Sequence, residues 1–347
     1  MIRIGRSKDS TSALLAYSGF GYPVGEEWRV HTSGVVWQTP VVFSMRQRMM
    51  IRMLGGVMQA SPEELSGETF QTRITPFMAD AHHRQSIIVT MNNKSFRLRK
   101  RTRKNGQFSD WLCVKKRDIE SAITTVGGRD TIKFSAHIDG SKTEPAEGII
   151  YLLPESGIGV VSDIDDTIKD SSVGDRRELL ANTFLREFRS IDGMAEVYRK
   201  WANDGASFHY VSSSPWQLYP CLQQLHSEHG FPLGTMHLRN FRLRDQLLKR
   251  VIIRRQGKAT AIRTLMKNLP KRRFLLIGDS GEKDPKIYRK ICRQFPQQIQ
   301  GVFIRNLPHR PLENERFQKL SSAIPHGKCA TFKTADELSE LAGELTG

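Results

Sequence analysis

The chain of 347 residues is poor in cysteine and has no long apolar run. Its four cysteines are far apart and form no Cys-x-x-Cys pair, which argues against a zinc site or a disulfide framework. The longest apolar stretches, around 148–153 and 274–277, are much shorter than the roughly 20 residues that a membrane-spanning helix needs. The first residues also lack an apolar segment of secretory length. We therefore expect a cytoplasmic protein with reduced thiols.

Acidic residues are scarce relative to basic ones: 36 Asp and Glu stand against 53 Lys and Arg, a net charge of +17. Such a surface attracts anions, so acidic lipid headgroups, phosphorylated substrates and nucleic acid are all candidate partners. The densest basic run, residues 97–104, is expected to form a β-hairpin arm with one charged face. Peripheral contact of this arm with an anionic membrane is the hypothesis, and nucleic acid is the less favoured alternative.

The first part of the chain, residues 1–155, has the pattern of a β-rich domain. Short runs of β-branched and aromatic residues are separated by Asn-Asn, Asn-Gly and Gly-Gly turn signals. We expect a small sandwich or barrel-like domain. The predicted strands are 71–77, 85–91, 111–115 and 130–138.

Residues 156–347 have a different rhythm, in which compact apolar runs alternate with segments of helical spacing. This alternation predicts an α/β domain with a doubly wound, mostly parallel sheet. The segment 169–190, between the first two strands, is too short for a large cap domain, so the site should be open. The predicted strands are 159–162, 207–211, 274–278 and 299–304, and the predicted helices are 194–202, 217–229, 258–267, 285–295 and 331–345.

Polar residues follow three of these strands. Asp163 and Asp165 come after the first, Ser212 after the second, and Asp279 and Asp284 after the third. In doubly wound sheets, ligands bind beyond the carboxyl ends of the strands, where the crossovers diverge. We therefore expect these side chains to share one site.

Three carboxylates and a hydroxyl suit phosphoryl transfer through a covalent aspartyl-phosphate. Asp163 would attack phosphorus, since a carboxylate is nucleophilic at neutral pH without an activating base. Asp165 would protonate the leaving alcohol and later activate water. Crowded carboxylates repel one another, so Mg²⁺ held by Asp163, Asp279 and the backbone carbonyl of Asp165 is expected, with support from Asp284 through water.

A hydroxyl donor and a fixed cation would complete the site, because charge spreads over the equatorial oxygens of the transferring phosphoryl group. Ser212 can supply the hydroxyl, and Lys258, which begins a helical segment, can supply the cation. Ser213 and Ser214 stay open as alternatives to Ser212. Thr167 is expected to brace the loop that carries the aspartates.

These residues resemble, in order, the four motifs of the haloacid-dehalogenase superfamily: Asp163-x-Asp165-x-Thr167, Ser212, Lys258, and the run 278–284. The likeness extends to the catalytic domain of the actin-patch-associated phosphatidate phosphatase family, over about residues 157–308. The resemblance implies a fold of the haloacid-dehalogenase type and Mg²⁺-dependent removal of phosphate from phosphatidate to give diacylglycerol. The segments that carry it are 162–168, 209–219, 277–288 and 302–305.

Three functions stay open from the sequence. The first is a phosphatidate phosphatase, for which the resemblance is the main support. The second is a phosphatase acting on nucleic-acid ends or phosphoproteins, which the open site and the positive charge fit equally well. The third is a catalytically idle basic binding module, against which the intact pair Asp163 and Asp165 argues.

Overall fold

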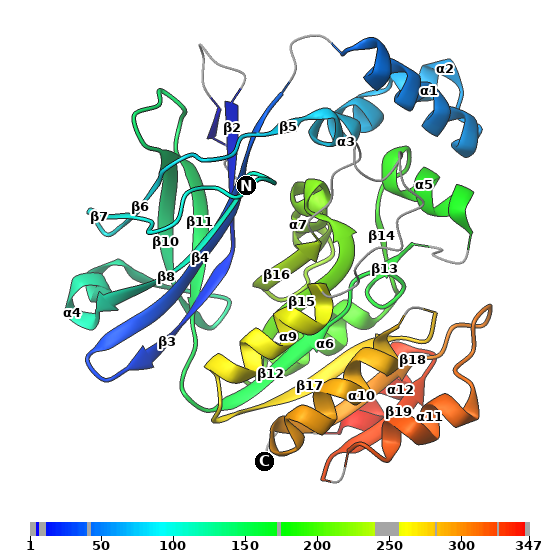
Figure 1. Cartoon of the computed structure of the whole chain (residues 1–347). Helices are drawn as coiled ribbons and strands as arrows, with labels where there is room; N and C mark the ends of the chain where they lie inside the picture. Colours follow the sequence, from blue (N-terminus) through cyan, green and yellow to red (C-terminus); the bar gives the residue numbers. More distant parts are fainter. Residues whose placement is uncertain are drawn as a thin grey trace. The chain divides into compact units, whose positions relative to one another are not determined.

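The computed structural model describes residues 5–6, 12–39, 43–171, 175–239, 257–281, 283–324 and 326–343 (Figure 1). These residues form two compact units, and the main change of unit along the chain falls between Pro154 and Glu155. The first unit comprises the described residues of Met1–Val57 and Ser66–Pro154. The second comprises those of Met58–Leu65, Glu155–Phe241 and Ile252–Gly347.

The first unit is built on an 11-stranded sheet whose paired strands are antiparallel, except for the parallel pair β3 and β11. The long strand β4 carries β3 and β2 along one edge and β8 along the other. Inward-facing side chains alternate with exposed ones along β8 and β10, as expected for strands that cover one core. The strands are β1 (Gly5–Arg6), β2 (Ser12–Tyr17), β3 (Gly19–Val24), β4 (Glu27–Gln38), β5 (Asp80–Ala81), β6 (Ile87–Met91), β7 (Lys94–Arg97), β8 (Gln107–Lys115), β9 (Ile123–Val126), β10 (Arg129–Ile138) and β11 (Ala146–Leu152).

Helices interrupt this sheet between β4 and β6. They are α1 (Met45–Met58), α2 (Pro62–Ser66) and α3 (Glu68–Met78), and a short α4 (Lys116–Ile119) follows β8. The prediction of a strand at 71–77 is therefore wrong. Phe70, Ile74 and Phe77 recur every three to four residues and are all buried, so the helical period of the apolar side chains outweighs the local β-branched content.

The basic run 97–104 is not a hairpin arm. Arg97 is the last residue of β7, and the residues after it form an irregular connection to β8. Two arginines of the run pair with acidic residues. Arg97 Nη2 lies 2.8 Å from Asp139 Oδ2, and Arg99 Nη2 lies 2.6 Å from Asp110 Oδ1. The predicted continuous charged face is thus partly neutralised.

The second unit contains a six-stranded sheet in the order β16-β15-β12-β17-β18-β19, with every neighbouring pair parallel. The four predicted strands are confirmed, and β16 and β19 were not predicted. One helix was predicted over 331–345, but β19 ends at Phe332 and the helix begins at Ala335. The strands are β12 (Gly157–Ser162), β15 (Ser207–Pro215), β16 (Gly234–Arg239), β17 (Arg272–Asp279), β18 (Ile299–Arg305) and β19 (Lys328–Phe332).

Helices connect these parallel strands, as the sequence predicted, and a two-stranded sheet of β13 (Lys169–Asp170) and β14 (Arg189–Ser190) lies between β12 and α6. None of the helices in the described parts of the chain is long and apolar enough to cross a membrane. Besides most of α2, the helices of the second unit in the described residues are α5 (Arg176–Phe184), α6 (Met194–Asn203), α7 (Tyr219–Glu228), α9 (Gly257–Asn268), α10 (Asp284–Gln294), α11 (Asn314–Ser321) and α12 (Ala335–Ala342).

The centre of the parallel sheet is the place where the strand order reverses. From β12 the chain passes to β15 and β16 on one side, and then returns to β17, β18 and β19 on the other. Val160, Val161 and Leu276 are fully buried, as expected for central strands covered on both faces. The carboxyl ends of β12 and β17 therefore lie side by side at the point where such sheets bind ligands.

Candidate active site

The loop after β12 folds back on itself so that residues six positions apart meet. Asp163 continues the strand, because its backbone N–H donates to the Ile277 carbonyl of β17 at 2.8 Å. Asp166 has a φ of 54°, in the left-handed region, which aspartate tolerates better than most residues. Its carboxylate accepts from the backbone N–H of Ser171 at 2.8 Å. This reversal brings the segment after the loop back toward Asp165.

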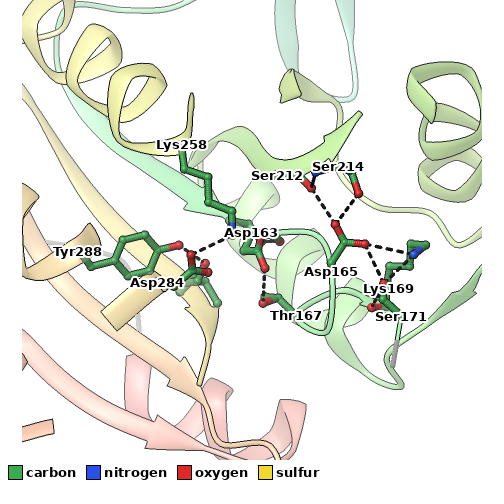
Figure 2. Close-up of polar contacts among 12 residues, drawn as sticks. Asp163, Asp165, Thr167, Lys169, Ser171, Ser212, Ser214, Lys258, Asp284 and Tyr288 are labelled. Atoms are coloured by element: carbon green, nitrogen blue, oxygen red, sulfur yellow. Dashed lines mark hydrogen bonds and ion pairs between the residues drawn. The ribbon is translucent and has the colours of Figure 1, made fainter. Parts of the chain in front are cut away.

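Asp163 lies in a buried cluster with a lysine and a second aspartate (Figure 2). The Nζ of Lys258, from the start of α9, lies 2.6 Å from Asp163 Oδ1 and 2.9 Å from Asp284 Oδ1. On the other oxygen, Thr167 Oγ1 donates to Asp163 Oδ2 at 3.2 Å. Thr167 thus contacts the candidate nucleophile directly. Lys258 and Thr167 together fix the orientation of its carboxylate.

Asp279 completes a group of three buried carboxylates with Asp163 and Asp284. Each offers one oxygen, and these oxygens lie within 4.8 Å of one another. Asp279 ends β17, and Asp284 begins α10. Gly278 makes room for this arrangement, because a Cβ at that position would lie 2.5 Å from Asp284 Oδ2.

The chemistry of this donor set fits a hard divalent cation. When ionised, the three carboxylates carry three negative charges, and the Lys258 ammonium contributes one positive charge. All three offer oxygen ligands, which are the ligands that Mg²⁺ prefers, and a divalent ion would balance the remaining charge. Asp163, Asp279 and Asp284 are therefore the residues that could hold such an ion.

Asp165 is directed away from this group, into a second polar network (Figure 2). Its Oδ2 accepts from Ser212 Oγ at 2.8 Å and from Ser214 Oγ at 2.7 Å. Its Oδ1 accepts from Ser171 Oγ at 2.8 Å and lies 3.2 Å from Lys169 Nζ. Burial alone would raise the pKa of Asp165. The Lys169 ammonium and the three hydroxyls outweigh it and hold this pKa well below its usual range.

The three consecutive serines near the carboxyl end of β15 differ in their surroundings. Ser212 is buried and Ser214 is half-buried, and both donate to the same oxygen of Asp165. Ser212 also accepts from the backbone N–H of Ser214 at 2.8 Å. Ser213 is exposed. Ser212 and Ser214 therefore both contact Asp165, the candidate acid and base, whereas the structure gives Ser213 an exposed position.

All six predicted site residues lie at the carboxyl end of the parallel sheet or in the elements that follow it. Sequence reasoning missed Lys169 and Ser171. The Lys169 side chain is 3% exposed, and its Nζ lies 4.7 Å from the centre of the Phe188 ring. The sequence alone does not distinguish a buried lysine such as Lys169 from a solvated lysine in an ordinary loop. The one hint in the sequence is the i,i+4 spacing of Asp165 and Lys169, which is also common on solvated surfaces.

Comparisons with known proteins converge on the second unit. Residues 158–306 match the family model for the catalytic domain of phosphatidate phosphatase APP1. Phosphatidate phosphatase APP1 of Saccharomyces cerevisiae is 39% identical over 171 residues, covering 48% of this chain and 28% of the yeast protein. An uncharacterized protein of Schizosaccharomyces pombe is 33% identical over 163 residues, covering 46% of this chain and 26% of that protein. The matched regions thus span little more than a quarter of either relative.

Proposed function

We propose that the protein hydrolyses phosphatidate to diacylglycerol and phosphate, because residues 158–306 match the family model for the catalytic domain of phosphatidate phosphatase APP1 and are similar to the yeast protein of that name. The observation that carries this proposal is the buried contact of Lys258 with both Asp163 and Asp284, next to the Asp165 network. A reactive carboxylate beside a fixed cation, with a second carboxylate two residues away, is what phosphoryl transfer through an aspartyl-phosphate requires.

We also assign the second unit to the haloacid-dehalogenase type. Its parallel sheet and the position of Asp163 at the reversal of strand order support this assignment. The spacing of Asp163, Asp165 and Thr167, together with Ser212, Lys258 and Asp279, follows the motif order of that superfamily.

In the first step, an oxygen of Asp163 attacks phosphorus, and the bond from phosphorus to the glycerol oxygen breaks. Lys258 orients the attacking carboxylate and offsets part of the negative charge that gathers there. The leaving oxygen takes a proton from Asp165. In the arrangement described here Asp165 is held ionised, so it must leave the contact with Lys169 and gain a proton before it can donate one.

In the second step, water attacks the phosphorus of the aspartyl-phosphate, and the bond to the Asp163 oxygen breaks to release phosphate. Asp165, ionised once it has given its proton to the leaving oxygen, accepts the proton of this water. In the arrangement described here, Ser212 and Ser214 hold the carboxylate of Asp165 away from Asp163 by donating to Oδ2. A hydroxyl of the same serines is available to the phosphoryl oxygens when Asp165 turns toward the substrate.

Asp163, Asp279 and Asp284 would hold Mg²⁺, together with the backbone carbonyl of Asp165. When bound, the ion would neutralise charge on the phosphoryl oxygens and reduce repulsion between the carboxylates. The positive net charge of the chain favours an anionic substrate of any kind, so it supports phosphatidate without distinguishing it from other phosphomonoesters.

Phosphate release from three substrates tests the proposal: phosphatidate in detergent micelles, a 5′-phosphorylated oligonucleotide, and a phosphoserine peptide. We expect phosphatidate to be hydrolysed at least tenfold faster than the other two at equal concentration. Asp165→Asn, which keeps the side-chain shape, serves as the control for contaminating activity. A preference for the oligonucleotide or the peptide would assign the second candidate function. No release from any substrate would favour the idle binding module.

A further inference from the structure

Helix α1 (Met45–Met58) of the first unit carries a stripe of exposed apolar side chains. Met45 is 86% exposed, Met49 is 58%, Met53 is 56% and Val57 is 41%. They recur every four residues, so at about 100° per residue they span an arc of about 120° on one side of the helix. Scattered single apolar residues are normal on a surface, but an aligned set of four along one helix indicates a contact surface.

The opposite side of α1 faces the protein. Met58 and Gly55 are buried, and Leu54 is half-buried. Gln47 Nε2 donates to the Met78 carbonyl at 2.7 Å, which ties α1 to the end of α3. The helix is therefore attached to its own unit through one face, and the methionine stripe is not needed for that attachment.

Arginines accompany the exposed methionines. Arg46, Arg48 and Arg52 are all exposed, and the sequence of α1 contains no acidic residue. In helical projection, Arg48 and Arg52 flank the stripe on one side, and Arg46 lies within it. The outer face of α1 thus combines flexible apolar side chains with three positive charges.

We propose that α1 docks the protein onto an anionic phospholipid bilayer, with its outer face (Met45, Met49, Met53, Val57, Arg46, Arg48 and Arg52) lying in the plane of the interface. An interfacial helix needs an apolar face that enters the boundary between headgroups and acyl chains, and basic side chains that meet the lipid phosphates. The charge of this face complements acidic headgroups. The proposal concerns a surface of the first unit and stands independently of the catalytic function.

The exposed methionines indicate more than a purely electrostatic contact. Exposed lysines and arginines suffice to attract an anionic surface, but methionines at 56–86% exposure are costly to leave in water. The long, flexible side chain of Met can adapt to a disordered environment. The basic run 97–104, by contrast, has two of its arginines paired with acidic residues. The structure thus favours α1 over that run as the membrane contact.

Co-sedimentation of the full chain with large vesicles tests this assignment. One set of vesicles is pure phosphatidylcholine, and the other contains 30% phosphatidylserine. We expect binding to the anionic vesicles only. Met45→Ser/Met49→Ser/Met53→Ser and Arg46→Gln/Arg48→Gln/Arg52→Gln should each lower the partition coefficient at least tenfold. The arginine variant should also show a weaker dependence on salt than the natural chain.

A matched control removes the same number of charges from the connection between β7 and β8, through Lys100→Gln/Arg101→Gln/Lys104→Gln. This variant should keep binding within about twofold. Protection of Met49 and Met53 from peroxide oxidation, measured by mass spectrometry with and without anionic vesicles, locates the contact directly. Circular dichroism and thermal unfolding exclude loss of structure in the variants.

The proposal is wrong if the natural chain does not bind anionic vesicles, or if the α1 variants bind as well as it does. It is also wrong if vesicle binding is lost in the variant of the β7–β8 connection and kept in the α1 variants. Unchanged oxidation of the α1 methionines on anionic vesicles would also contradict it. Asp163→Asn should bind like the natural chain, so failure of the catalytic proposal leaves this test intact.

Discussion

The ammonium of Lys258 lies 2.6 Å from Oδ1 of Asp163, and both side chains are buried. A buried ion pair of this kind contributes little net stability, because desolvation of the two charges offsets their attraction. Its value lies in geometry: the pair fixes a carboxylate at the end of β12, beside the carboxylates that follow β17. A cluster that is costly for folding and well ordered is typical of a site retained for chemistry.

Lys169 should control the ionisation of Asp165. Replacing it by Met removes the charge that opposes the effect of burial, so the pKa of Asp165 should rise toward and above its ordinary range. As the pH is lowered, Asp165 then becomes protonated sooner, so the step that needs its ionised form is lost at a higher pH than in the natural chain. We expect the acid limb of the pH–rate profile to move upward by about one unit or more. Lys271→Met, which removes an exposed lysine paired with Glu155, is the control. An unmoved acid limb in Lys169→Met would show that this lysine has only a structural role.

The three serines near the carboxyl end of β15 should differ in their contribution to turnover. Ser212→Ala and Ser214→Ala each remove a hydrogen bond to the Asp165 carboxylate, so each should lower kcat about 10- to 100-fold. Ser213→Ala should stay within about twofold of the natural chain, because Ser213 is exposed. Steady-state kinetics on phosphatidate micelles measure all three. A larger loss in Ser213→Ala than in the other two would reverse the assignment.

Divalent cation binding should be visible without any assay of activity. A ligand that binds the folded state raises the midpoint of thermal unfolding, so Mg²⁺ well above its dissociation constant should raise it by about 5 °C. Asp279→Asn should abolish this rise, because it removes one of the three clustered carboxylates. Asp110→Asn removes a buried carboxylate of the first unit that pairs with Arg99, and it should keep the rise. Equal Mg²⁺ effects in both variants would place the ion elsewhere.

His226 should make the second unit sensitive to mild acid. Burial lowers the pKa of His226 to about 3, and its ring packs against Tyr210 with centroids 4.2 Å apart. The unfolded chain takes up the proton below its ordinary pKa of 6.5, whereas the folded chain does so only near 3. Stability is therefore complete above pH 6.5 and falls as the pH drops from there toward 3. The loss should be about 2 kcal/mol at pH 5.

His226→Phe tests this sign, because the variant has no imidazole to protonate. Thermal unfolding between pH 5 and 7.5 should show a smaller fall for this variant than for the natural chain. His309→Gln, at an exposed position, serves as the control and should follow the natural chain. If His226→Phe loses as much stability on acidification as the natural chain, the imidazole is not the responsible group.

Much of the second unit could be predicted from sequence, for a physical reason. Central parallel strands must be apolar on both faces, so runs such as 274–278 are visible, and the residues just after them fall at the binding edge. Asp163 and Asp279 were placed in this way, and Lys258 was placed from its position at the start of a helical segment; the structure brings the three together. Edge strands carry a weaker signal, and β16 and β19 were missed.

The remainder depends on contacts that local pattern does not encode. Lys169 and Ser171 reach Asp165 because Asp166 adopts a positive φ, and no residue count reveals that reversal. The β-branched residues of 71–77 favoured a strand, whereas the helical spacing of Phe70, Ile74 and Phe77 prevails because all three are buried on one face of α3. The arginines of the run 97–104 looked uniformly solvated, but two of them pair with acidic residues distant in sequence.

The most direct test of the central claim is to trap the phosphorylated intermediate. The enzyme is mixed with phosphatidate, quenched rapidly in acid and digested, and the peptide containing Asp163 is examined by mass spectrometry. The account predicts a phosphoryl adduct on Asp163 that appears before steady state. It also predicts that Asp163→Asn forms no adduct and hydrolyses no substrate. Full activity in Asp163→Asn, or an adduct on another residue, would contradict it.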